Sequence, residues 1–292
     1  MFGFINVNKP SGMTSHDVVS FLRRNLKIKK IGHTGTLDPM ASGVLPIAVG
    51  DATRLIQYLS DDKEYVATVK FGESTDTYDK EGEVTFKSDK IVEKSELEDA
   101  LTKFRGEILQ KPPIYSALKK NGKKLYEYAR EGKEVEIEAR KVTIEKLDLL
   151  SFENNIAKLR VKCSKGTYIR SIANDLGEVL GSGGHLIGLI RTVAGDFKIE
   201  DAVQLSDIEN SENKEIFIEN PLNYFSNLKK VELNDDEYLK VSHGMNFSSN
   251  KFTNCNNELI ILLYCTKIVA VTQIINKKTS LEKVFVKWKR FI

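Results

Sequence analysis

Residues 142–150 (VTIEKLDLL) and 157–163 (AKLRVKC) decide the fold, because they form two β-strand patterns in succession. Apolar residues recur among polar and charged ones in both stretches, at the spacing of half-buried strands. The short run 135–137 (VEI) precedes them as a third expected strand. Successive strands with short links pair antiparallel, since a parallel pair requires a long crossover. We therefore expect an α+β protein with a mixed, largely antiparallel sheet flanked by helices.

Further patterns toward the N-terminus extend this sheet. Residues 2–7, 44–49 and 65–71 are expected strands. One helix is expected to begin after a cap at Thr14 or Ser15, because Asp17 stands at capping-box spacing from Thr14. Apolar residues at helical spacing predict further helices at 53–59, before Gly106 and before Gly181. Helices and strands do not alternate strictly, so a doubly wound parallel sheet is not predicted.

The C-terminal part of the chain is rich in strand patterns. Residues 259–265, 268–275 and 284–288 are expected strands. An acidic, Asn-containing stretch at 206–220 is the expected boundary. The chain is therefore predicted to form two domains, at 1–222 and 223–292.

Composition excludes several classes of protein. The 292 residues are 41% hydrophobic and 29% charged, which is ordinary for a globular chain and not for a disordered one. Apolar runs such as 259–264 are too short to span a membrane, and the N-terminus has no signal-peptide layout. Three separated cysteines give no disulfide framework. These features predict a cytoplasmic protein without a membrane partner.

Charge is distributed unevenly along the chain. The net charge of +3 is too small to indicate nucleic-acid binding by itself. However, seven Lys and Arg residues face one acid in 103–124, and four face one acid in 281–292. Aromatic residues lie in these segments or directly beside them, namely Tyr115, Tyr126, Phe285 and Trp288. The combination modestly favours contacts with a phosphate backbone.

Motifs for cofactors and metals are absent from the sequence. There is no phosphate-binding Gly-x-x-x-x-Gly-Lys loop, no Gly-x-Gly-x-x-Gly fingerprint and no His-Glu-x-x-His pair. The four histidines have no metal-ligand spacing. If the protein is an enzyme, we expect chemistry from carboxylate, tyrosine and arginine side chains, without a metal or organic cofactor.

The most informative stretch is 32–43 (GHTGTLDPMASG), which has three glycines and no periodicity. It is expected to be an ordered loop. Pro39 biases Asp38 toward extended geometry, so a carboxylate would point in one fixed direction, as a nucleophile requires. From spacing alone, a turn-forming Asp38 is the simpler interpretation.

Residues 32–46 closely resemble the catalytic motif of the TruB family of bacterial tRNA pseudouridine synthases. Other segments resemble the family's further motifs in the same order: 8–15, 63–67 with 75–79, 111–119 with Gly122, 163–171 and 185–192. The resemblance runs from about residue 3 to 192. It thins after about 223, where only 243–245 and the basic end are suggestive.

The resemblance implies a function and an architecture. The family isomerises the uridine at position 55, in the T-loop of tRNA, to pseudouridine after the base has been flipped out, and it needs no cofactor. It implies a pseudouridine-synthase-type catalytic domain with an RNA-gripping insertion at about 107–141 and a divergent, PUA-like RNA-binding domain at the C-terminus. The expected partner is the T-arm of tRNA, and the expected state is a monomer. An alternative is a tRNA-folding chaperone that uses the same cleft.

The resemblance also assigns roles to single residues. Asp38 is the catalytic aspartate, Arg170 pairs with it, and Tyr65 stacks on the target base and takes part in proton removal at C5. Substrate-binding positions are Lys9, His33, Asp79, Tyr168 and Leu189, and RNA-binding positions are Lys111, Lys119, Lys120, Lys123 and Lys124. Without the resemblance, the simpler interpretation of Tyr65 and Leu189 is that they are core residues. Arg170 would then be a charge on the surface of a helix, His33 a loop residue and Asp79 a turn residue.

Overall fold

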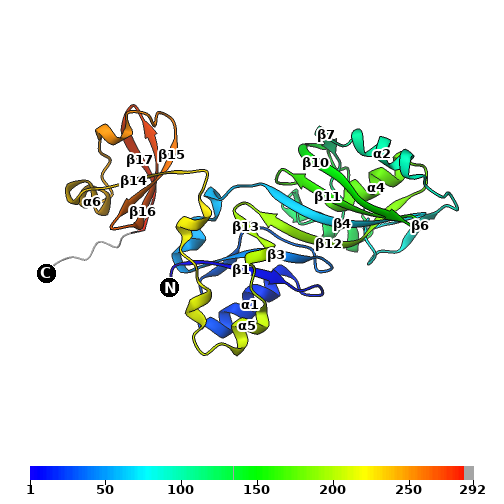
Figure 1. Cartoon of the computed structure of the whole chain (residues 1–292), viewed down its shortest axis with the longest axis horizontal. Helices are drawn as coiled ribbons and strands as arrows, with labels where there is room; N and C mark the ends of the chain where they lie inside the picture. The colour runs from blue at the N-terminus through cyan, green and yellow to red at the C-terminus, as the bar shows by residue number, and fades with distance from the viewer. Residues whose placement is uncertain (134, 286–292) are drawn as a thin grey trace.

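The structure is a computed structural model that describes residues 1–133 and 135–285 (Figure 1). Its helices are α1 (Ser15–Leu26), α2 (Lys94–Thr102), α3 (Leu125–Arg130), α4 (Ile169–Val179), α5 (Leu205–Asn210) and α6 (Asp235–Ser242). The first strands are β1 (Gly3–Lys9), β2 (Ile31–His33), β3 (Ser42–Val49), β4 (Lys63–Phe71), β5 (Glu73–Thr75), β6 (Val84–Lys87) and β7 (Gly106–Gln110). They are followed by β8 (Lys119–Lys120), β9 (Lys123–Lys124), β10 (Arg140–Glu153), β11 (Ile156–Cys163), β12 (Gly184–Ala194) and β13 (Phe197–Lys198). The C-terminal strands are β14 (Lys229–Glu232), β15 (Leu259–Tyr264), β16 (Lys267–Ile275) and β17 (Lys278–Val284).

The large sheet has the strand order β1-β3-β12-β4-β11-β10-β7. Its pairs are antiparallel except β12 with β3, which is parallel. The predicted α+β fold with a mixed, largely antiparallel sheet is therefore confirmed. In Figure 1 the sheet runs through the body of the molecule, with α1 and α5 near β1 and with α2 and α4 near β10 and β11.

A second sheet, β14-β15-β16-β17, lies at the other end of the molecule beside α6 (Figure 1). The chain stays with the first domain through Tyr224 and Phe225: the ring of Tyr224 stacks on Phe197 at 3.7 Å between centroids, and Phe225 contacts Phe4. The crossing to the second sheet therefore falls between Phe225 and Lys229.

Helix α1 forms as the local sequence predicts. Thr14 is its N-cap, and Thr14 and Asp17 form a reciprocal capping box. The expected apolar stripe of Val18, Val19, Leu22 and Leu26 is buried against β1 and β3. The capping box fixes where the helix begins, and with it the turn between β1 and α1 that reaches the 32–43 loop.

Four expectations about secondary structure were wrong or only partly right. Residues 135–137 form no strand, because β7 ends at Gln110 before two prolines and offers them no partner strand. Residues 53–59 lie in two short 3₁₀ turns rather than one helix. The ends of 32–43 join β2 and β3, so the irregular loop is 34–41. Of the expected strand at 284–288, Val284 ends β17, whereas residues 286–288, with Trp288 and the cations around it, lie outside the described residues.

Close backbone packing fixes α4 against β12. A Cβ atom built at Gly177 would lie 2.1 Å from the backbone nitrogen of Gly184 and 2.3 Å from the carbonyl carbon of Gly183. Only glycine allows this approach. The position of the whole helix, including its first turn, depends on this contact.

Replacing Gly177 with alanine should therefore destabilise the protein, although alanine is the better helix former. We expect Gly177→Ala to lower the free energy of unfolding by roughly 2 kcal/mol through backbone displacement. Val179→Ala, at a half-exposed position of the same helix, should change it much less. Urea unfolding of both variants measures the difference, and equal stabilities would contradict the packing argument.

Candidate active site

Asp38 and Arg170 form the centre of the site. Arg170 Nη2 donates a hydrogen bond to Asp38 Oδ1 at 3.2 Å, and Nε lies 3.0 Å from Oδ2 in a charge contact. The Arg170 side chain is 7% exposed, whereas the Asp38 side chain is 33% exposed. The arginine therefore holds the carboxylate from below and leaves part of it open to solvent. This is the arrangement expected of a carboxylate that must meet a substrate.

Arg170 also binds three other groups. Its guanidinium donates to the carbonyl oxygens of Thr77 at 3.2 Å and Tyr115 at 3.1 Å. Nη1 lies 3.5 Å from Oδ2 of Asp79, which is itself buried. Asp79 Oδ1 accepts hydrogen bonds from the Thr77 hydroxyl and from the amide of Glu81. The structure thus brings the predicted residues Asp38, Asp79 and Arg170 into one charge network.

The turn between β1 and α1 supports the loop that carries Asp38. Ser15 Oγ donates to the Leu37 carbonyl and accepts from the Leu37 amide. Lys9 Nζ donates to the carbonyl oxygens of Pro10, Met13 and Pro39, at 2.8, 2.6 and 3.3 Å. Lys9 is fully buried. It was expected at the substrate, but the structure places its ammonium group beneath the loop, where it holds the backbone next to Asp38.

Tyr65 and Leu189 lie side by side in the central strands. They belong to the same buried cluster as Leu37, and each is 7% exposed. Burial raises the pKa of the Tyr65 hydroxyl, and the charge of Arg191 opposes that shift. The sequence interpretation required one open face of the Tyr65 ring. A base that stacks on it in full must displace neighbouring side chains.

Tyr168 is held through its backbone at the start of α4. Gln110 binds it twice: the side-chain amide donates to the Tyr168 carbonyl at 3.0 Å, and the side-chain oxygen accepts from the Tyr168 amide at 2.8 Å. Burial raises the pKa of its hydroxyl, while the positive charge of Arg170 opposes the shift. Gln110 was not predicted, because a glutamine in a strand carries no motif signal.

His33 ends β2, immediately before the loop. Its Nδ1 is buried without a hydrogen-bond partner. Burial lowers the pKa of the imidazole, and the charges of Arg191 and His16 add to the effect. The ring is therefore neutral near pH 7 and presents no positive charge to the site.

The predicted RNA-binding lysines lie in and around the β8–β9 hairpin. Lys111 and Lys119 are exposed, whereas Lys120, Lys123 and Lys124 are half-buried. Lys123 forms an ion pair with Glu131, and its ammonium also lies 4.9 Å from the Tyr128 ring centroid. Lys124 lies 5.3 Å from the Tyr126 ring. The hairpin thus combines aromatic rings and cations, as the sequence indicated.

A second group of cations was missed by the sequence interpretation. Arg23, Arg24, Lys27, Lys29 and Lys30 are five cations within eight residues, all exposed, at the end of α1 and before β2. Lys30 pairs with Asp51, and Arg23 donates to the Ile31 carbonyl. Together with Ile28, the first four line a surface hollow of about 460 Å³. The density of positive charge was readable in the sequence and is the signal that could have found them.

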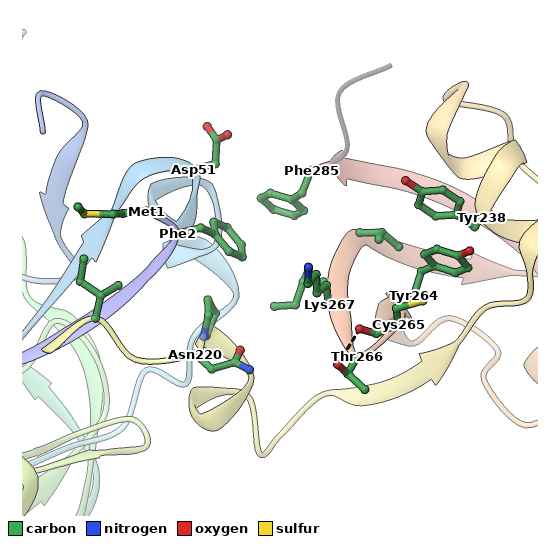
Figure 2. Close-up of a pocket in the computed structure, with 14 residues that line it drawn as sticks. Met1, Phe2, Asp51, Asn220, Tyr238, Tyr264, Cys265, Thr266, Lys267 and Phe285 are labelled. Carbon is green, nitrogen blue, oxygen red and sulfur yellow. Dashed lines mark hydrogen bonds between the residues drawn. The ribbon is translucent and has the colours of Figure 1, made fainter. Parts of the chain in front are cut away.

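A cavity of about 790 Å³ lies between the two domains, away from Asp38 (Figure 2). Figure 2 shows Met1, Phe2, Asp51 and Asn220 on one side and the stacked rings of Tyr238 and Tyr264 on the other. Phe285 lies between them. The guanidinium carbon of Arg54 lies over its ring, 5.0 Å from the ring centroid. Asp38 is not among the residues that line this cavity.

Two further properties concern ligands and membranes. In residues 1–133 and 135–285, no group of three or more His, Cys, Asp or Glu side chains is arranged to hold a metal ion. Within the same ranges, no helix is long and apolar enough to cross a membrane.

Comparison with known sequences bears on this geometry. The model of the TruB family pseudouridylate synthase N-terminal domain matches residues 23–169, and that of the tRNA pseudouridylate synthase B C-terminal domain matches 170–225. A tRNA pseudouridine synthase B of Francisella philomiragia is 53% identical over 71% of this chain and 70% of that protein. The protein of that name from Francisella tularensis subsp. novicida is 48% identical over 81% of this chain and 78% of that protein.

Solved structures show the same fold. The structure titled "Crystal Structure of a Cbf5-Nop10-Gar1 Complex" aligns with a TM-score of 0.75 at 28% identity, over 98% of this chain and 85% of that chain. An H/ACA RNP bound to a substrate RNA containing 2'-deoxyuridine gives the same TM-score at 27% identity, with the same coverage. The fold and the carboxylate–arginine site, taken with these matches, define a pseudouridine synthase, which is an isomerase. Within that class, the chain belongs to the TruB family.

Titration of Lys9 should be visible in the stability of the protein. Burial lowers the pKa of Lys9 from 10.5 to about 8. The negative charge of Asp38 opposes this shift, and the positive charge of Arg191 adds to it. Between about pH 8 and 10.5 the unfolded chain holds a proton at Lys9 that the folded protein has released. This group therefore makes the folded state more stable as pH rises through that window.

We expect the stability of the wild-type protein to rise with pH relative to Lys9→Met between pH 8 and 10. Urea unfolding at half-unit intervals measures both curves. Lys29→Met, at an exposed position, serves as the control and should run parallel to wild type. Parallel curves for Lys9→Met would contradict the buried position of Lys9.

Proposed function

We propose that this isomerase converts the uridine at position 55, in the T-loop of tRNA, to pseudouridine, with Asp38 as its catalytic carboxylate. The observation that carries the proposal is the open, arginine-held Asp38 carboxylate on a pseudouridine-synthase fold. The relatives named tRNA pseudouridine synthase B support tRNA as the substrate.

The reaction rearranges one bond. The N1–C1′ glycosidic bond breaks, the uracil turns, and a C5–C1′ bond forms. The C5 proton leaves to water, and N1, now free of the ribose, takes a proton from water. No atoms are added and no electrons are transferred. The protein must hold the ribose and a carboxylate in place while the base turns, and two contacts from Arg170 fix the direction of the Asp38 carboxylate.

We propose that the other site residues surround the flipped nucleotide. Extruding a base from a folded RNA loop costs a few kcal/mol, and stacking on an aromatic ring returns ~1–3 kcal/mol per base. Tyr65 is assigned to the base and to proton removal at C5, and Tyr168 and Leu189 line the same space. His33 fills the gap left in the RNA, and its neutral ring suits stacking. Asp79 and Lys9 act through Arg170 and the loop backbone.

The RNA backbone is proposed to lie across two cationic surfaces. One is the insertion at about 107–141, with Lys111, Lys119, Lys120, Lys123 and Lys124. The other is the cation cluster of Arg24, Lys27, Lys29 and Lys30 at the end of α1, which leads directly into β2 and the catalytic loop. Such contacts position the RNA and make binding depend on salt.

The remaining proposals concern the whole molecule. We propose two domains that meet a few residues after the predicted boundary between 1–222 and 223–292, since Tyr224 and Phe225 pack on the first sheet. We propose that the second domain is PUA-like and RNA-binding, which the separate four-stranded sheet supports. We also propose a monomer, since exposed apolar residues such as Leu109, Ile216 and Leu239 lie on separate elements. A cytoplasmic location is supported by Cys163 and Cys255, which are buried free thiols.

The chemistry is tested with a T-arm stem-loop labelled with tritium at uracil C5. Forming the C5–C1′ bond must release the tritium to water. We expect release by the wild-type enzyme and a loss of at least ~1000-fold with Asp38→Asn, which keeps the size of the side chain but removes its charge. Asp51→Asn, which removes an exposed carboxylate outside the site, serves as the control.

Three results would contradict the proposal. Undiminished release by Asp38→Asn would exclude Asp38 as the catalytic group. Release from whole tRNA but not from the T-arm would place the target elsewhere in tRNA. Binding without release from either RNA would favour the tRNA-folding chaperone, which an RNA-folding assay with the same proteins would then measure.

The two cationic surfaces are tested by the salt dependence of binding. Each lost phosphate contact should reduce the slope of log K against log salt by ~0.7–0.9. Triple substitutions to glutamine at Lys111, Lys119 and Lys120, or at Arg24, Lys27 and Lys29, should each reduce it by about 2. Lys94→Gln, on α2 where Lys94 pairs with Glu98, should leave it unchanged. An unchanged slope for either triple variant removes that surface from the RNA footprint.

A further inference from the structure

Arg191 is a buried cation that no assigned role explains. It lies in β12 and is 1% exposed, so it is among the largest fully buried side chains of the described residues. Across residues 1–133 and 135–285, no carboxylate lies within ion-pair distance of its guanidinium, in contrast to Arg170. Burying a guanidinium without a carboxylate is expensive, and an apolar side chain of similar size would stabilise the fold more.

The guanidinium is bound instead by the two ends of the catalytic loop. Nε donates to the Val44 carbonyl at 2.7 Å. Nη1 and Nη2 donate to the carbonyls of Thr36 and Gly35, each at 3.3 Å. Two of these carbonyls precede Asp38 and one follows it. A single rigid group therefore joins the chain entering the loop to the chain leaving it.

The backbone of Arg191 adds a second contact to the same loop. Arg191 pairs with Gly43 in the parallel β3–β12 ladder. Gly43 has φ +104°, and a Cβ atom there would lie 2.3 Å from the Arg191 carbonyl oxygen. The loop end and the strand are thus in direct backbone contact, which limits any movement of the loop relative to β12.

On its other side Arg191 reaches Tyr65. The two residues are register partners in the β4–β12 ladder, so their side chains stand on the same face of the sheet. The positive charge of Arg191 opposes the rise in the pKa of the Tyr65 hydroxyl that burial causes. Lys9, His33 and Lys63 also experience its positive charge. Arg191 is therefore the contact between the loop that carries Asp38 and the tyrosine assigned to the base.

We propose that Arg191 is a positioning residue for the isomerisation: its guanidinium clamps the loop around Asp38 and fixes the Tyr65 hydroxyl toward the same space. The proposal rests on the roles proposed above for Asp38 and Tyr65. Arg170 orients the carboxylate itself, whereas Arg191 holds the backbone that carries it. The requirement is for a planar fork with several donors, which lysine does not provide.

The test compares Arg191→Met and Arg191→Lys with wild type in the tritium-release assay under saturating and limiting T-arm RNA. We expect Arg191→Met to lower kcat by about 100-fold, with KM for RNA within about threefold of wild type, because misplacing a reacting group affects the chemical step. Arg191→Lys should recover part of kcat, because it keeps the charge but loses the fork. Arg54→Met removes a similar arginine-to-carbonyl hydrogen bond far from the site and should leave kcat unchanged.

Ionisation of Tyr65 supplies a readout that a merely structural arginine would not move. The tyrosinate absorbance of each protein is titrated with and without Tyr65→Phe, so that the difference reports Tyr65 alone. The charge of Arg191 opposes the rise in the pKa of Tyr65. We therefore expect Tyr65 to ionise at higher pH in Arg191→Met than in wild type, and close to wild type in Arg191→Lys.

Several results would overturn the inference. An unchanged kcat in Arg191→Met would do so. A lower kcat in Arg191→Met would also do so if Tyr65 in that variant ionised at the same pH as in the wild type. If Arg191→Met does not fold, Arg191→Lys decides alone, and wild-type kcat in that variant rejects the requirement for a fork. Failure of the proposed function is seen separately, since the wild-type enzyme would then release no tritium.

Discussion

The site depends on one buried guanidinium, that of Arg170. It binds the Asp38 carboxylate, contacts Asp79 and donates to the carbonyls of Thr77 and Tyr115. These partners come from the loop that carries Asp38, from the turn after β5 and from the segment that follows β7. Asp38 lies 132 residues from Arg170 in sequence. A buried cation must find an acceptor for nearly every donor. Because these acceptors belong to three different segments, the charge of one side chain fixes how the segments meet.

The central strands and the loop contribute differently. Strands β4 and β12 are neighbours and place Tyr65 and Leu189 on a sheet that cannot shift. The loop at 34–41 has no regular structure, yet side chains satisfy its backbone: Ser15 at Leu37, Lys9 at Pro39, and Arg191 at Gly35 and Thr36. An irregular loop loses much conformational entropy when it is ordered. Side-chain donors from three elements offset that loss and keep the carboxylate in place.

Local signals in the sequence were sufficient for part of this structure. The capping box and apolar stripe predicted α1, and alternation predicted β4 and β11, because these patterns depend on neighbouring residues alone. The meeting of Asp38 with Arg170 could be expected only from the motif resemblance, since no local rule links positions so far apart. The burial of Lys9 and Arg191 was not predicted, because such residues are mostly exposed. Tyr115 gave no signal, since its contribution to Arg170 is a backbone carbonyl.

Lys9 and Arg191 show which side chains of the site lower the stability of the folded protein. Both are buried, both are bound by backbone carbonyls, and both contact the loop around Asp38. Each lowers the stability of the folded state relative to an apolar residue, and the apolar cluster of the central sheet must compensate. This loss of stability occurs when the protein folds. In the proposed reaction, the polar groups therefore do not reorganise when the glycosidic bond breaks. In that reaction, the carboxylate and the loop that carries it stay in place while the base turns.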